Sequence, residues 1–194
     1  MSTSMEASLL MDGVASLDSA LDRAAALCDA WEAHRHAGCA AMGTFAAAAA
    51  AVSAPAPTLP PSVLDLLPEG RSQRPQGDPR GAAWALLEAK HRCLLEAANG
   101  MSAVVAELQE VGAGARALTA ALAEGELGAA AGTERGAVVA AGDVLPLLQT
   151  WSAELAGETE LKAETVRGLW AHLDHEATLR HYNQAWRVGQ RRLS

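Results

Sequence analysis

The sequence predicts an all-α protein: three long helices and a short C-terminal helix that form an elongated coiled-coil or helical bundle. Large apolar residues recur at steps of three and four along each long segment, as they do on one side of a helix. Half of the 194 residues are hydrophobic, but alanine dominates that half, and alanine favours helix while burying little area. There is no strand-like alternation and no repeat of fixed period. Such helices are expected to pack on one another or on a partner.

The first helix is predicted over residues 16–52, after a flexible N-terminus at 1–15. Ser16 can act as its N-cap, because its hydroxyl can accept a hydrogen bond from a free amide of the first turn. The apolar side of this helix carries Leu17, Leu21, Ala24, Cys28, Trp31, Met42 and Phe45.

A Pro-rich linker is predicted over residues 53–80. Seven of the eight prolines fall between Pro55 and Pro79, and proline cannot continue a helix. The linker contains a short apolar island, Pro60–Leu67. This island is either a single helical turn tucked on the bundle or a short linear motif that a partner reads, and both alternatives stay open.

The long middle helix is predicted over residues 81–124, with a kink or register change at Gly112 and Gly114. A coiled-coil seam runs along it through Trp84, Leu87, His91, Leu94, Ala98, Met101, Val105 and Leu108. Glycine then recurs among small residues, which predicts a mobile Gly-rich connection over 125–142.

The C-terminal helices are predicted over residues 143–188. Asp143 can cap the first of them, with Pro146 in its first turn, where a missing amide proton leaves nothing unpaired. Its apolar stripe carries Val144, Leu148, Trp151, Leu155, Val166, Leu169 and Leu173, with Thr159 and Lys162 at the intervening positions. Its opposite side carries Glu154, Glu158, Glu160, Glu164 and Arg167.

A short last helix is expected after Asp174, followed by a basic tail at 189–194. From Glu176 onward four arginines face one glutamate, a net charge of +3. This segment is either a solvated tail or a docking tail for an acidic partner or RNA. Positive charge suits the C-terminal end of a helix, because the helix dipole is negative there.

Charge and cysteine content limit the classes of protein that fit. The net charge of -8 argues against broad nucleic-acid binding, and no sequence-specific binding is expected. Cys28, Cys39 and Cys93 lack metal-site spacing and are odd in number, so buried or semi-buried thiols in a reducing compartment are expected. No secretory signal is recognised at 1–8, and the run Phe45–Val52 is too short to span a membrane. A soluble intracellular protein is expected.

No catalytic, cofactor or metal site is predicted. The phosphate-binding, dinucleotide-binding, hydrolase-elbow and zincin motifs do not occur. His172 and His175 could share a helix face at i, i+3, with Glu176 and His181 nearby, but Asp174 is expected to break the helix between them. His34 and His36 lie two residues apart and therefore on different helix faces, and His91 lies on the seam.

The five tryptophans are either the core anchors of alanine-rich helices or anchors for a partner, since tryptophan is enriched at binding hot spots. Trp170 is the best candidate for a partner anchor because it lies off the main stripe, and Trp186 is the next. The predicted partner-binding residues are Trp151, Leu155, Val166, Leu169, Trp170, Leu179, Tyr182 and Trp186.

The chain resembles the cyclin-dependent kinase-interacting protein family (CINP), whose members are small all-helical adaptors. The likeness lies in the order of the helices and in four short stretches, covering about two thirds of the chain. These are Asp29-Ala30-Trp31-Glu32, Trp151-Ser152-Ala153-Glu154-Leu155, Leu161-Lys162-Ala163-Glu164-Thr165-Val166, and the run Asp174, Thr178, Leu179, Tyr182 and Trp186. The high alanine content and the Gly-rich connection depart from the family pattern.

The resemblance implies a non-catalytic, CINP-like adaptor of the nucleus, and also of the cytoplasm, acting in ribosome biogenesis, DNA replication, the DNA damage response and the cell cycle. It implies a small helical protein partner and AAA ATPases, with a cyclin-dependent kinase as a further partner, and no membrane contact. Two alternatives come from other classes: a coiled-coil tether of a cytoskeletal, kinetochore or trafficking complex, and a small bundle enzyme or metal carrier using the His172–His181 group.

Overall fold

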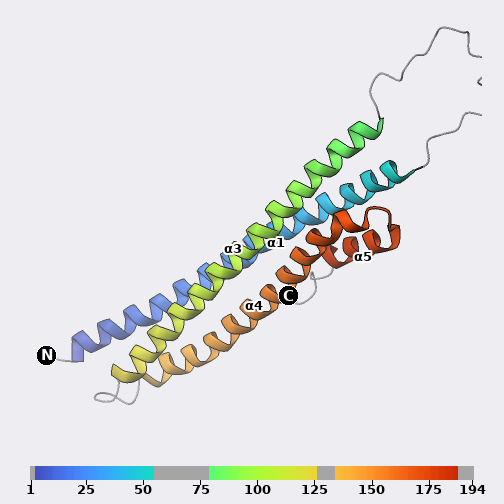
Figure 1. Cartoon of the computed structure of the whole chain (residues 1–194). Helices are drawn as coiled ribbons and strands as arrows, with labels where there is room; N and C mark the ends of the chain where they lie inside the picture. The colour runs from blue at the N-terminus through green and yellow to red at the C-terminus, as the bar shows by residue number, and fades with distance from the viewer. Residues whose placement is uncertain (1–2, 55–78, 126–133, 188–194) are drawn as a thin grey trace, which may run out of the picture. The chain divides into compact units, whose positions relative to one another are not determined.

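The computed structural model describes residues 3–54, 79–125 and 134–187, and the side chains of 16–54, 80–121 and 144–187 (Figure 1). These residues form the α-helices α1 (Thr3–Ser53), α3 (Pro79–Gly125), α4 (Glu134–Gly168) and α5 (Glu176–Arg187), with the 3-10 helix η2 (Leu169–His172) between the last two. No strand occurs in the described ranges. The predicted all-α class, with three long helices and a short last one, is confirmed.

The first helix begins earlier than predicted. α1 starts at Thr3, so the prediction of a flexible segment over 1–15 is wrong from Thr3 onward, and Ser16 lies inside the helix instead of capping it. The physical reason is composition: residues 3–15 are mostly alanine, leucine, methionine, serine and glutamate, and a single glycine in a helix costs only about 1 kcal/mol.

α3 agrees with the predicted middle helix but has no break. It is α-helical through both Gly112 and Gly114, so the predicted interruption does not occur. The buried neighbours Leu108, Val111 and Ala115 hold this stretch in place. Their burial outweighs the roughly 1 kcal/mol that each glycine costs in a helix interior.

α4 also begins earlier than predicted. It starts at Glu134, so Asp143 is an interior residue and Pro146 lies inside the helix. The predicted cap at Asp143 and the predicted connection over 134–142 are therefore wrong. Alanine and valine at 137–141 continue the helix, and proline removes a single amide donor from it. The other parts of the predicted linker, connection and tail that fall on 55–78, 126–133 and 188–194, including the island Pro60–Leu67, lie outside the described residues.

The chain divides into two compact units, to which α1, α3 and α4 each contribute. Unit 1 comprises Met1–His36 and Ala97–Ala163, and unit 2 comprises Ala37–Glu96 and Glu164–Ser194. In unit 1, α3 runs in the opposite direction to α1 and α4 (Figure 1). The core of unit 1 is formed by Leu17, Ala24, Trp31, Met101, Leu108, Leu148 and Leu155. The core of unit 2 is formed by Met42, Phe45, Leu87, Leu94, Val166, Leu169, Leu179 and Trp186.

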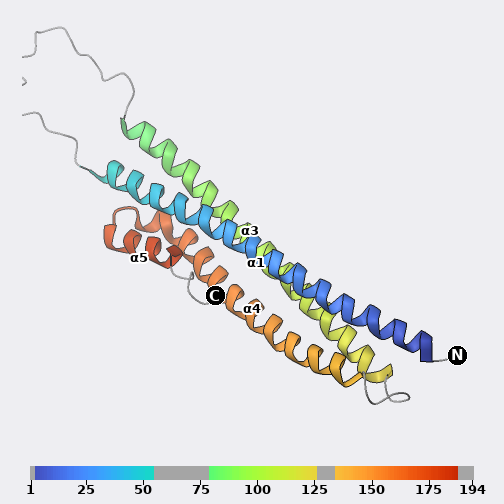
Figure 2. The same ribbon diagram turned by 180° about the vertical axis from the view of Figure 1, so that it is seen from behind.

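In unit 2 the chain reverses after η2, and α5 lies alongside the end of α4 (Figure 2). The amide of His175 donates to the carbonyl of His172 at 3.0 Å and closes the turn that contains Asp174. Gly168 makes room for Tyr182, because a Cβ at this position would lie 2.9 Å from the Tyr182 hydroxyl oxygen. The predicted helix break at Asp174 and the short helix after it are confirmed.

One segment, Ser16–Ser53 of α1, is long and apolar enough to cross a membrane by length and composition, with a mean hydropathy of 1.2. A core helix of a soluble protein passes the same test. The apolar end of this segment packs inside unit 2 through Met42, Phe45, Ala48 and Ala49.

Candidate partner-binding surface

An aromatic cluster in unit 2 surrounds Trp170, which η2 carries. Three rings meet it: His91 with ring centroids 5.1 Å apart, Phe45 at 5.8 Å, and Trp84 at 6.5 Å. The Phe45 ring is nearly perpendicular to Trp170, whereas Trp84 stacks on it with an interplanar angle of 11°. Helices α1, α3 and η2 therefore supply one continuous group of rings.

Trp170 comes directly after the buried Leu169 in the 3-10 helix η2. In a 3-10 helix successive side chains are about 120° apart rather than about 100°. Leu169 continues the buried stripe and is fully buried, while the next residue, Trp170, turns away from the core. The sequence-based view that Trp170 lies off the stripe is consistent with this arrangement.

Two members of the cluster reach solvent. Trp84 is 43% exposed and Trp170 is 38% exposed, whereas Trp31 and Trp186 are 1% and 0% exposed. We call the first two residues the Trp84–Trp170 surface. Trp84 was predicted as the first member of the α3 seam, but it is exposed instead of buried, because it lies close to the beginning of α3.

Most of the other predicted partner-binding residues belong to the core. Leu155, Val166, Leu169, Leu179 and Trp186 are buried, while Trp151 and Tyr182 are half-buried. In this structure Trp186 is therefore a core anchor, which is the alternative that the sequence left open. Buried side chains stabilise the core of the unit to which they belong, and they are not accessible to a partner in this structure.

Each unit has a buried tryptophan tied to a threonine of α4. In unit 1 the indole nitrogen of Trp31 donates to Thr159 Oγ1 at 2.9 Å. In unit 2 the indole nitrogen of Trp186 donates to Thr165 Oγ1 at 2.8 Å. A buried indole N–H needs such an acceptor, because leaving it unpaired costs about 1–3 kcal/mol. The sequence placed Thr159 on the buried stripe but did not indicate its tryptophan partner.

Unit 1 also buries two cationic side chains, Lys162 of α4 and Arg35 of α1. Lys162 Nζ lies 5.5 Å from the Trp31 ring centroid and 3.1 Å from Glu158 Oε2. Arg35 Nη2 lies 2.7 Å from Glu32 Oε2. Both carboxylates are partly exposed, so each pair neutralises its cation while the acid keeps contact with water.

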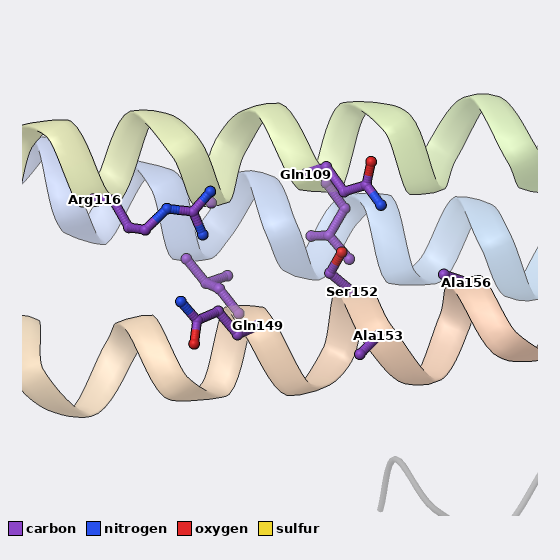
Figure 3. Close-up of a pocket in the computed structure, with 9 residues that line it drawn as sticks. Gln109, Arg116, Gln149, Ser152, Ala153 and Ala156 are labelled. Carbon is purple, nitrogen blue, oxygen red and sulfur yellow. The ribbon is translucent and has the colours of Figure 1, made fainter.

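A groove in unit 1 opens between α3 and α4 (Figure 3). Its volume is about 240 Å³. The residues that line it are Leu108, Gln109, Gly112, Arg116, Leu148, Gln149, Ser152, Ala153 and Ala156. Amide and guanidinium groups can bind a carbonyl or carboxylate, but the lining contains no histidine or acid to activate Ser152 as a nucleophile. Sequence reasoning missed this groove, because it arises where two helices meet.

A second cavity, of about 370 Å³, lies in unit 2 beside the turn between η2 and α5. Small residues of α1, such as Ala46 and Ala50, leave the space, and Leu173 and Leu179 line its other side. Glu176 and Arg180 lie at this cavity as an exposed pair 3.9 Å apart, which contributes at most about 1 kcal/mol.

The histidines fall into two different situations. His34 and His36 lie on different faces, as predicted: His34 is half-buried against Gly100, and His36 is exposed beside Arg35. His172 and His175, however, are brought together across the Asp174 turn, with their Nδ1 atoms 3.5 Å apart. Within the described residues no group of three or more histidine, cysteine or acidic side chains is arranged to hold a metal ion.

None of the three cysteines forms a disulfide. Cys28 and Cys39 are half-buried, as predicted, and Cys39 Sγ donates to the carbonyl of Trp186 at 2.9 Å. Cys93 is exposed, so the prediction of a buried or half-buried thiol is wrong there. Burial raises the pKa of the Cys28 thiol above its usual value, and the negative charge of Asp29 raises it further. A raised pKa keeps Cys28 in its unreactive thiol form.

Comparison with known proteins does not assign the chain to a family. No protein family, no curated protein and no solved structure matches the chain. The structure defines the class as an all-α protein of coiled-coil-like architecture with an exposed aromatic surface. The resemblance to the cyclin-dependent kinase-interacting protein family stays a prediction.

Proposed function

We propose that this protein is a non-catalytic helical adaptor that binds a protein partner through the Trp84–Trp170 surface. The observation that carries the proposal is that these two tryptophans stack on one another while 43% and 38% of their surfaces face solvent. Two other tryptophans, Trp31 and Trp186, are fully buried and anchor the cores of the two units. The exposed pair is therefore more than these cores require.

The energetics favour a partner at this surface. A tryptophan side chain can bury roughly 250 Å², so about 40% exposure leaves on the order of 100 Å² of each ring in water. At about 25 cal/mol per Å², covering both rings would contribute about 5 kcal/mol to binding. The Trp170 ring is held by Phe45 and His91 and stacks on Trp84, so little side-chain freedom is lost when a partner docks.

The kind of partner follows from the resemblance set out above. The motif likeness supports pairing with a small helical protein and action beside AAA ATPases in ribosome biogenesis and genome maintenance, with a cyclin-dependent kinase as a further partner. The ATPases would then carry the catalysis, and the adaptor would be nuclear. This part of the proposal rests on family-level analogy rather than on the geometry of a site.

Purification of the tagged protein from its own cells, followed by mass spectrometry, tests the proposal. The wild type is compared with the double variant Trp84→Ala/Trp170→Ala and with the control Leu161→Ala, which removes a 49% exposed leucine of unit 1. We expect the double variant to lose its main partner while the control retains it, with equal helicity by circular dichroism. Recovery of the same partner by the double variant would exclude this surface.

The same experiment tests the kind of partner. A small helical companion recovered together with AAA ATPases would support the CINP-like adaptor. Cytoskeletal, kinetochore or trafficking proteins in their place would favour the coiled-coil tether. Because the two tests use different readouts, the surface can be right even if the predicted partner is wrong.

A further inference from the structure

The turn between η2 and α5 brings the Nδ1 atoms of two imidazoles close together. His172 is the last residue of η2, and His175 lies directly before α5. Their Nδ1 atoms are 3.5 Å apart, and their ring planes are inclined by 33°. The sequence predicted a helix break at Asp174, and the turn formed at this break is the feature that brings the two side chains together.

The spacing of these nitrogens fits a metal ion. Zinc binds imidazole nitrogen at about 2.0–2.1 Å in tetrahedral geometry, and two nitrogens on such an ion lie about 3.3–3.4 Å apart. The observed separation of 3.5 Å is close to this value. Imidazole also suits copper and nickel, whereas magnesium and calcium prefer oxygen ligands. We infer that His172 and His175 form a two-histidine site for Zn²⁺, Cu²⁺ or Ni²⁺.

The backbone holds this pair in position. The amide of His175 donates to the carbonyl of His172, and the amide of Leu179 donates to the carbonyl of His175, each at 3.0 Å. Leu169 and Leu179 anchor the two sides of the turn in the core. Tyr182 meets His172 edge to face, with ring centroids 6.0 Å apart. A site with its ligands fixed in advance loses less entropy when the ion binds.

The site is open, since two histidines leave two positions of a tetrahedral ion for water or for a group from another molecule. His175 is exposed and His172 is half-buried, so an ion can reach both from solvent. A bound ion would link η2 to the start of α5. Because η2 also carries Trp170, the ion would stiffen the segment that presents one of the exposed tryptophans.

Titration of tag-free full-length protein with Zn²⁺ by calorimetry tests the inference. We expect one ion per chain, and at least a tenfold loss of affinity in both His172→Ala and His175→Ala. His181→Ala is the matched control, because His181 is an exposed neighbour on α5 whose ring meets Tyr182 rather than the pair. Cys93→Ser controls for binding to the exposed thiol. Both controls should bind as the wild type does.

Co²⁺ absorption gives a second readout, because tetrahedral and octahedral cobalt differ in intensity and cobalt bound to a thiolate adds a charge-transfer band. Tetrahedral bands without a charge-transfer band, lost in His175→Ala, would support the site. Wild-type protein without stoichiometric binding, or His172→Ala and His175→Ala variants that bind like the wild type, would overturn it. Circular dichroism checks that the variants are folded, and His175→Ala replaces an exposed side chain, so the test does not depend on His172 alone.

Discussion

Unit 1 and unit 2 share one anchoring device but differ in charge and in the use of aromatic residues. Each buries one tryptophan whose indole nitrogen donates to a threonine of α4. Unit 1 contains 15 acidic and 5 basic residues, a net charge of -10, whereas unit 2 contains 8 acidic and 10 basic residues, a net charge of +2. Unit 2 also holds five of the seven aromatic residues.

The difference separates what the fold needs from what remains for binding. Unit 1 buries two cations, Lys162, which lies over the Trp31 ring, and Arg35. Unit 2 fills its core with Trp186 and Phe45 and still exposes Trp84 and Trp170. Each unit has one fully buried tryptophan, and unit 2 also has the exposed pair Trp84 and Trp170, which we propose as the partner surface.

The largest expected effect comes from removing the shared anchors. Trp31→Ala and Trp186→Ala should each lower the free energy of unfolding by about 3–5 kcal/mol, because a large cavity forms and a buried threonine loses its hydrogen-bond partner. Chemical denaturation followed by circular dichroism measures both. If either variant lowers the free energy of unfolding by less than about 1 kcal/mol, that unit does not depend on its buried tryptophan, and the two units do not share this anchor.

The close approach of Gly38 to Trp186 comes next. A Cβ at Gly38 would collide with the Trp186 ring, so Gly38→Ala should lower the free energy of unfolding by about 1–3 kcal/mol. Gly43→Ala in the same helix is the matched control, because a Cβ there meets nothing within 4 Å. It should raise stability by about 0.5–1 kcal/mol through its better helix propensity. Equal thermal shifts for the two variants would mean that Trp186 does not pack on Gly38.

The buried cation of unit 1 gives a prediction of intermediate size. Lys162→Met keeps most of the side-chain volume and removes the cost of burying a charge, so stability should stay within about 1 kcal/mol of the wild type or rise. Lys162→Ala should lower it by about 2–3 kcal/mol, because packing against Trp31 is lost. Urea titrations of both variants make the measurement. If Lys162→Met is as damaging as Lys162→Ala, the charge itself stabilises unit 1.

The exposed tryptophans should contribute less to folding than the buried ones. Trp84→Ala and Trp170→Ala should each lower the free energy of unfolding by about 1–3 kcal/mol, since only part of each side chain is removed from water. The same denaturation assay gives the value. A loss similar to that of Trp186→Ala would reassign the residue to the core and remove the distinction between the two units.

The smallest expected effect concerns the Cys28 thiol of unit 1. Because burial raises its pKa, Cys28 has less thiolate at a given alkaline pH and should be alkylated by iodoacetamide more slowly than the exposed Cys93 of unit 2. The folded state holds this proton more tightly than the unfolded state, so the contribution to stability is present below the unfolded pKa and is lost as pH rises through the folded pKa. Peptide mapping at several pH values measures the alkylation rates, and faster modification of Cys28 would contradict the prediction.

Helix ends were predicted less well than helix existence. The apolar stripes correctly identified most buried positions of α1, α3 and α4, although Trp84 is exposed and the buried Arg35 and Thr165 were missed, and Asp174 correctly marked the last break. The starts of α1 and α4 were misplaced, because Ser16 and Asp143 have the chemistry of N-caps but lie inside helices. A capping side chain contributes only about 1 kcal/mol, which the alanine-rich residues around it offset.

The sequence by itself determined the all-α class, the periodic stripes and the position of Trp170 off the main stripe. These properties follow from helix geometry and from local propensity, which act between neighbours along the chain. Tertiary structure alone decided that Trp186 is buried while Trp84 is exposed, that Thr159 and Thr165 accept from tryptophans, and that His172 meets His175. Those outcomes depend on which helices approach one another, and helical periodicity identifies the apolar side of a helix without identifying what covers it.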